Sequence, residues 1–162
     1  MRQMTEITMT DLAMYSDRAT LATSEAQRIG RLLGLDNPPA DRVGLAARIA
    51  TGLAASAASA LSGAIAPVAG AMALIPEATL RRARNAKTPL SREMSERLYE
   101  VGRIVDMVSR IHHGDVRAIS AFLNTPHPLL DDATPLDLAR SSSAGADAVA
   151  DLLTRAEAGF AV

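Results

Sequence analysis

The sequence predicts an all-α protein in which a helix-turn-helix-like helical domain is followed by a small three-helix domain. Aromatic residues make up only 2% of the 162 residues, so the core has to be built from Ala, Leu, Val, Ile and Met, a composition that favours helices. Apolar positions recur at spacings of three and four, and no segment alternates at period two for long enough to form a sheet. An apolar fraction of 48% is enough for a compact core.

Charge and cysteine content exclude several classes of function. The net charge is −1, so any contact with nucleic acid has to come from a local basic patch. The chain has no cysteine, which excludes disulfides, thiolate catalysis and Cys-ligated zinc. Its first fifteen residues lack the basic end and the continuous apolar stretch of a signal peptide. We therefore expect a cytoplasmic protein.

Residues 1–42 are expected to form an N-terminal helical extension without a recognisable motif. A helix is predicted from Ser24 to Leu33, ended by Gly34 and the following prolines. Residues 43–113 are predicted to be the second domain.

An uncharged stretch at residues 49–76 is long enough to span a bilayer, but it is mostly Ala, Ser and Gly, which gain little in lipid. We predict two or three short helices there, broken at Pro67 and at three glycines, Gly52, Gly63 and Gly70.

A long helix is predicted to begin after Ser91, whose side chain would cap it, and to stop at Gly114. One wide apolar stripe runs along this helix and contains Met94, Leu98, Val101, Ile104, Val105, Val108 and Ile111. The stripe is wider than one short neighbouring helix would cover, and operator-binding helix-turn-helix proteins usually present two reading helices. We therefore expect a homodimer.

The tripeptide Ile75-Pro76-Glu77 has the pattern of the turn in a helix-turn-helix. Residues 68–74 would end the first helix, and Glu77 to Ala86 would form the second. The predicted DNA-contacting residues on or beside this second helix are Thr79, Arg81, Arg82, Arg84 and Lys87. A solvated basic face on a surface helix is the alternative interpretation.

Residues 114–162 are predicted to form three short helices. The first begins after Asp115 and ends before Pro126, since the residue ahead of a proline avoids helical geometry. The second begins at Thr134 as its cap. The third runs from Asp147 to Ala158, with Ala156 facing inward and Gly159 as its stop.

The sequence offers no convincing catalytic or metal-binding constellation. The candidate residues are the pair His112 and His113, the isolated His127, the neighbouring Asp131 and Asp132, and the run Ser141 to Ser143. None of them has the partners that metal binding or nucleophilic catalysis requires. We expect no catalytic residue, no metal site and no cofactor.

Four motifs follow one another in the last region: AFLNTPHPLL at 121–130, TPLDL at 134–138, Gly145, and LLTRAEAG at 152–159. This order closely resembles the C-terminal toxin-binding domain of the Xre/MbcA/ParS antitoxin family. Residues 79–82 and 90–91 also resemble the family's basic helix and the start of its long helix, although here both arginines follow Leu80 directly.

The resemblance implies an antitoxin and not an enzyme. Family members neutralise RES-domain toxins, which have an ADP-ribosyltransferase-like fold and act on NAD, and many repress their own operon. The C-terminal segment of the antitoxin covers the NAD pocket of the toxin. In this chain the positions matching that toxin-binding segment are Arg155, Gly159, Phe160, Ala161 and Val162.

The expected partners are a cognate RES toxin, operator DNA, and a second copy of the chain within a toxin-antitoxin hetero-oligomer. Two alternatives stay open, a stand-alone helix-turn-helix transcriptional regulator and an all-helical enzyme. For the C-terminal segment the alternative is a frayed tail that carries a Phe by chance.

Overall fold

The computed structural model describes residues 11–159, and every regular element in this range is a helix, which confirms the all-α prediction. In chain order the elements are η1 (Asp11–Ser16), α1 (Arg18–Leu21), α2 (Glu25–Leu32), α3 (Arg42–Ala50), α4 (Ala55–Ala69), α5 (Glu77–Ala86), α6 (Arg92–Ile111), α7 (Val116–Asn124), η2 (Pro128–Leu130), α8 (Pro135–Ser141) and α9 (Ser143–Glu157).

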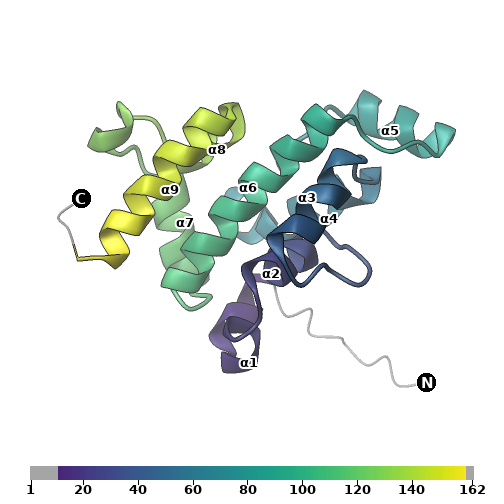
Figure 1. Cartoon of the computed structure of the whole chain (residues 1–162). Helices are drawn as coiled ribbons and strands as arrows, with labels where there is room; N and C mark the ends of the chain where they lie inside the picture. The colour runs from purple at the N-terminus through teal and green to yellow at the C-terminus, as the bar shows by residue number, and fades with distance from the viewer. Residues whose placement is uncertain (1–10, 160–162) are drawn as a thin grey trace, which may run out of the picture.

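Helix α6 lies at the centre of the molecule, with α8 and α9 on one side and α2, α3 and α4 on the other (Figure 1). It begins where the sequence predicts, because the Ser91 hydroxyl accepts a hydrogen bond from the Met94 amide at 3.2 Å. Its predicted stop is also confirmed, since Gly114 has a φ of +76°. Asp115 then caps α7 through the Arg117 amide at 3.0 Å.

Neighbouring helices of the same chain cover the apolar stripe of α6. Leu98, Ile104, Val105 and Val108 are fully buried, and α2, α3, α4, α8 and α9 all contact this helix. The width of the stripe is therefore explained by packing within one chain and gives no support to a homodimer.

The uncharged region contains one long helix, α4, where shorter pieces are predicted. Gly52 and Gly70 end helices as predicted, with φ values of +91° and +70°. The predicted breaks at Gly63 and Pro67 are wrong, because both residues lie inside α4. Pro67 sits in the last turn, and the one carbonyl that loses an amide partner belongs to Gly63, which is exposed to water. In the described part of the chain, no helix is long and apolar enough to cross a membrane.

The two helices predicted on either side of Ile75-Pro76-Glu77 can be compared with the structure. The predicted second helix is confirmed as α5, with the bounds Glu77–Ala86. The predicted end of the first helix is wrong, because α4 stops at Ala69 and residues 70–76 form a connecting loop. Gly70, with a φ of +70°, ends the helix, and the buried Leu74 and Ile75 then hold the loop against the core.

The C-terminal helices follow the predicted order. Helix α8 is capped by Thr134, whose hydroxyl accepts from the Asp137 amide at 3.2 Å. Helix α9 begins four residues before the predicted Asp147, because the Ser142 hydroxyl caps it through the Gly145 amide at 2.9 Å. Ala156 is exposed and not inward-facing, since the buried cluster ends at Leu153.

One buried apolar cluster runs from Leu12 to Leu153 and includes residues of all three predicted regions. The predicted helix near residue 24 is confirmed as α2, with a capping box between Ser24 and Gln27. Because η1 and α2 both contact α6, the N-terminal extension contributes to the same core as the C-terminal helices.

Candidate functional site

Helix α5 displays two arginines to solvent. Leu80 and Ala83 are buried and fix the orientation of the helix. Arg81 and Arg82 are exposed, and no ion pair within residues 11–159 involves either of them. Their guanidinium groups are therefore available for an anionic partner.

The other predicted DNA-contacting residues are placed differently. The Arg84 guanidinium donates to the Ser59 hydroxyl on α4 at 2.6 Å and lies 3.5 Å from the Glu77 carboxylate. Lys87 is exposed but follows the helix with a φ of +52°, so it does not continue the helical row. Thr79 is half-buried at the first turn. The structure thus leaves Arg81 and Arg82 exposed on α5 and ties Arg84 to the neighbouring helix.

Ion pairs fasten the C-terminal helix α9 along α6. Arg103 donates to the Asp147 carboxylate at 2.7 Å and to Glu100 at 2.6 Å. Further along α6, the Arg110 guanidinium lies 3.2 Å from the Glu157 carboxylate in the last turn of α9. Two separate ion pairs therefore link α9 to α6, one near the start of α9 and one in its last turn.

The predicted toxin-binding segment starts at this end of α9. Arg155 is exposed in the last turn, and Gly159 is exposed with a φ of +79°. Phe160, Ala161 and Val162 lie outside the described residues.

The loop between α7 and α8 has a fixed backbone. The His127 carbonyl accepts from the Leu130 and Asp132 amides at 2.9 and 3.1 Å, and the His127 amide donates to the Ala133 carbonyl at 3.1 Å. The His127 Nδ1 accepts from the Leu129 amide at 3.1 Å. His127 is therefore engaged in organising this loop through its backbone and its ring.

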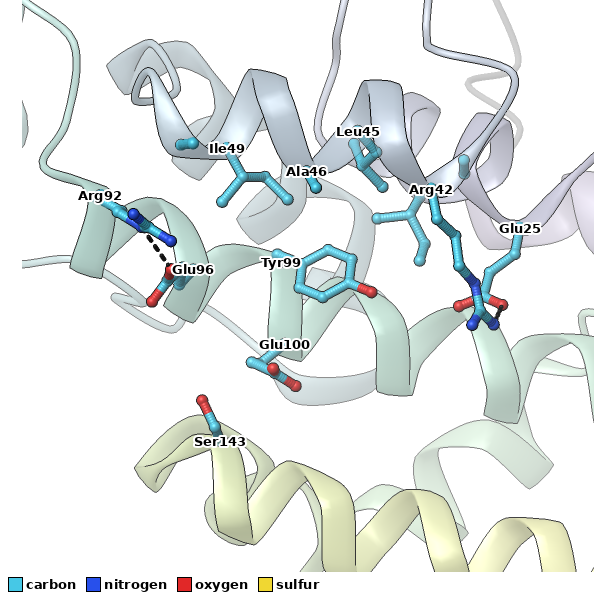
Figure 2. Close-up of a pocket in the computed structure, with 13 residues that line it drawn as sticks. Glu25, Arg42, Leu45, Ala46, Ile49, Arg92, Glu96, Tyr99, Glu100 and Ser143 are labelled. Atoms are coloured by element: carbon cyan, nitrogen blue, oxygen red, sulfur yellow. Dashed lines mark hydrogen bonds and ion pairs between the residues drawn. The ribbon is translucent and has the colours of Figure 1, made fainter.

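A groove of about 460 Å³ lies between α2, α3 and α6. Figure 2 shows the Tyr99 ring beside Leu45 and Ile49 of α3, with ion pairs toward both ends of the groove. These pairs are Arg42 with Glu25 at 2.7 Å and Arg92 with Glu96 at 2.9 Å.

The groove suits an apolar chain segment better than a reaction. Its charged groups are all paired, Glu25 with Arg42, Glu96 with Arg92, and Glu100 with Arg103 beside the groove. Burial raises the pKa of Tyr99, so this hydroxyl is protonated at neutral pH and can donate a hydrogen bond. No motif in the sequence predicts the groove, because helices far apart in the chain build it. Tyr99, one of two tyrosines in a chain with few aromatics, was the available signal.

A second feature that the sequence did not reveal is a buried polar cluster of Tyr15, Arg28 and Asp106. The Tyr15 hydroxyl donates to Asp106 at 2.6 Å, and the Arg28 Nε donates to the same carboxylate at 2.8 Å. All three side chains are less than 8% exposed. Because they satisfy one another away from solvent, the cluster is suited to holding the fold and not to catalysis.

The other polar residues considered from the sequence have local structural roles. His112 is the C-cap of α6, and Ser142 caps α9. Asp131 and Asp132 are exposed loop residues. Within residues 11–159, no group of three His, Asp or Glu side chains is arranged to hold a metal ion.

Comparison with known protein families identifies the C-terminal helices. Residues 107–159, about a third of the chain, match the family model described as the antitoxin Xre/MbcA/ParS C-terminal toxin-binding domain. This segment is an Xre/MbcA/ParS toxin-binding domain. No curated protein and no solved structure matches the chain.

The toxin-binding domain comprises the last turns of α6 together with α7, η2, α8 and α9. It therefore contains the fixed loop around His127 and the exposed Arg155, whereas the groove at Tyr99 lies almost entirely outside it. The family indicates an antitoxin, so a toxin is the partner of this domain.

Proposed function

We propose that this chain is the antitoxin of a type II toxin-antitoxin system and that it neutralises a RES-domain toxin. In this proposal the C-terminal segment covers the NAD pocket of the toxin. The observation that carries the proposal is the toxin-binding domain at residues 107–159. The RES identity of the toxin rests on the resemblance of the sequence motifs to this family.

The proposed toxin-binding segment consists of Arg155, Gly159, Phe160, Ala161 and Val162. Arg155 is exposed in the last turn of α9, where the neighbouring Glu157 pairs with Arg110 of α6, and this placement supports its role in the proposal. A pocket that binds the flat rings of a dinucleotide has apolar walls, which the Phe160 side chain can fill. The exposed guanidinium of Arg155 can pair with a carboxylate at the rim.

Deletion of residues 159–162 tests this role. Growth should no longer be rescued when the truncated chain is co-expressed with the toxin encoded beside it, while circular dichroism stays that of the intact fold, because these residues follow the last helix. The matched control is Ala158→Ser, an exposed and conservative change that should still neutralise. Full rescue by the truncated chain would contradict the proposal.

We also propose that α5 contacts operator DNA and represses the operon. Exposed Arg81 and Arg82 supply the phosphate contacts, with Thr79, Arg84 and Lys87 beside them. Changing both Arg81 and Arg82 to Ala should weaken binding to operator DNA. The slope of the logarithm of the binding constant against the logarithm of the salt concentration should become shallower by roughly two units, about 0.9 for each lost phosphate contact. The exposed Arg117→Ala on α7 is the matched control. An unchanged slope in the double variant would leave α5 as a solvated basic helix.

A homodimer within the toxin-antitoxin complex completes the proposal, because helix-turn-helix proteins usually read two half-sites. The buried stripe of α6 is not available for it, so the contact has to use surface residues. Light scattering of the wild-type chain at micromolar concentration should give twice the mass of 17.0 kDa. A stand-alone regulator is the alternative, and it would purify without a second protein.

A further inference from the structure

The loop between α7 and α8 exposes a large apolar side chain at its tip. Leu129 is 58% exposed, whereas its neighbour Leu130 is 6% exposed and anchors the loop in the core. Only one other large apolar side chain of the described residues is exposed, Val43 on α3 at 81%, and it lies outside the toxin-binding domain. Figure 1 shows the loop standing out from the helices at the edge of the molecule.

The backbone holds Leu129 in place before any partner binds. Pro126 and Pro128 restrict the chain on both sides of His127, just before Leu129, and the Leu129 amide donates a hydrogen bond to the His127 ring. The bond from the His127 amide to the Ala133 carbonyl closes the loop. A partner that binds Leu129 therefore loses little free energy to ordering this segment.

The residues after Leu129 carry charge and conformational strain. Asp131 and Asp132 have φ values of +53° and +59°, a region that non-glycine residues occupy at a cost of roughly 1–2 kcal/mol each. Both carboxylates are exposed, and no ion pair within residues 11–159 involves them. The loop therefore presents two exposed carboxylates next to Leu129.

We propose that Leu129 inserts into an apolar pocket on the toxin surface and that basic side chains at the rim of that pocket face Asp131 and Asp132. A single exposed leucine is ordinary on a protein surface. Here the leucine is fixed by its loop, flanked by two free carboxylates, and part of a toxin-binding domain. The contact is separate from the C-terminal segment and is suited to choosing the cognate toxin, because shape and charge at the tip both have to match.

The inference rests on the proposed antitoxin function, and a matched pair of variants separates the two. The probe is the purified protein encoded beside this chain, and its binding to the full-length antitoxin is measured by titration calorimetry. Leu129→Asp should weaken binding by at least about tenfold, as expected for a central apolar anchor. Val43→Asp introduces the same charge at the other exposed apolar residue and should bind like wild type.

A second variant tests the charge. Replacing Asp131 and Asp132 by Asn keeps residues that tolerate the left-handed conformation and removes both carboxylates. Its association rate should fall and should depend less on salt than the wild-type rate. Wild-type affinity of Leu129→Asp would overturn the inference and leave the antitoxin function intact. Failure of the wild-type chain to bind the probe would refute the proposed function, and the inference would fall with it.

Discussion

At the scale of single residues, the buried cluster of Tyr15, Arg28 and Asp106 joins parts of the chain that are far apart in sequence. Asp106 lies 91 residues from Tyr15 and 78 residues from Arg28. An isolated charge buried on α6 would be costly, and here the guanidinium and the phenol hydroxyl both compensate it. The N-terminal residues are thus required for the central helix to bury a carboxylate.

The Tyr15 hydroxyl should make stability depend on alkaline pH. Burial raises the pKa of Tyr15, and so do the charge of Asp106 and the hydrogen bond to it. The folded state therefore keeps this proton while the unfolded state loses it above about pH 10, so the free energy of unfolding should fall by about 1.4 kcal/mol per pH unit there. Urea unfolding between pH 8 and 11 measures the effect.

Tyr15→Phe should be less stable than wild type at neutral pH but should show a flatter decline above pH 10. Tyr99→Phe is the comparison: the pKa of Tyr99 is also raised, but its side chain is only half-buried, so this variant should flatten the decline less than Tyr15→Phe does. An unchanged decline in Tyr15→Phe would show that the decline has another origin.

The left-handed Asp131 provides a second test at this scale. Asp131→Gly should increase the free energy of unfolding by up to about 1 kcal/mol, because glycine adopts positive φ without steric cost. Asp137→Gly is the control, since Asp137 is equally exposed but helical, and glycine there should destabilise. Urea midpoints of the two variants, compared with wild type, should move in opposite directions.

At the scale of elements, most helices start with a side-chain cap and α4 does not. Its N-cap is the exposed Ala54, which leaves the first amides without a side-chain acceptor. Ala54→Asp should stabilise the protein by about 1 kcal/mol, and Ser142→Ala, which removes the cap of α9, should destabilise it by a similar amount. Thermal unfolding of both variants checks the sign, and a lower melting temperature for Ala54→Asp would contradict the prediction.

Local signals decided which elements could be predicted from the sequence. The cap Ser91, the cap Thr134 and the loop before α8 were readable because each depends on a few neighbouring residues. The continuation of α4 through Pro67 could not be predicted in this way. A proline is tolerated there because it lies in the final turn and because the unpaired Gly63 carbonyl is exposed to solvent.

Gly145 shows the same limit for packing. A Cβ there would collide with the Leu138 carbonyl, so glycine lets the first turn of α9 approach the end of α8. Sequence reasoning used Gly145 as a motif residue but could not predict that contact. The buried cluster at Asp106 and the groove at Tyr99 could not be predicted for the same reason, because residues distant in sequence build both.

At the scale of the whole molecule, the chain has one hydrophobic core, and α6 passes through it. Val105→Glu should therefore unfold the single chain, with a loss of more than about 3 kcal/mol, because the charge would be buried among helices of the same molecule. Arg97→Glu places a charge of the same sign on the exposed side of α6 and should cost less than about 1 kcal/mol. If Val105→Glu were instead a folded monomer, the apolar stripe of α6 would have to be a homodimer interface and not part of a single-chain core.

The bond between Tyr15 and Asp106 also constrains the order of events during synthesis. Residues near the N-terminus leave the ribosome first, but the helix that covers Leu12, Tyr15 and Ile29 is made only several dozen residues later. Until α6 emerges, these side chains have only the contacts that α3 and α4 make with η1 and α2, so part of their native cover is missing and they remain exposed to chaperones and proteases. A nascent chain interrupted before residue 106 should therefore be degraded, so functional antitoxin accumulates only from ribosomes that complete most of the message.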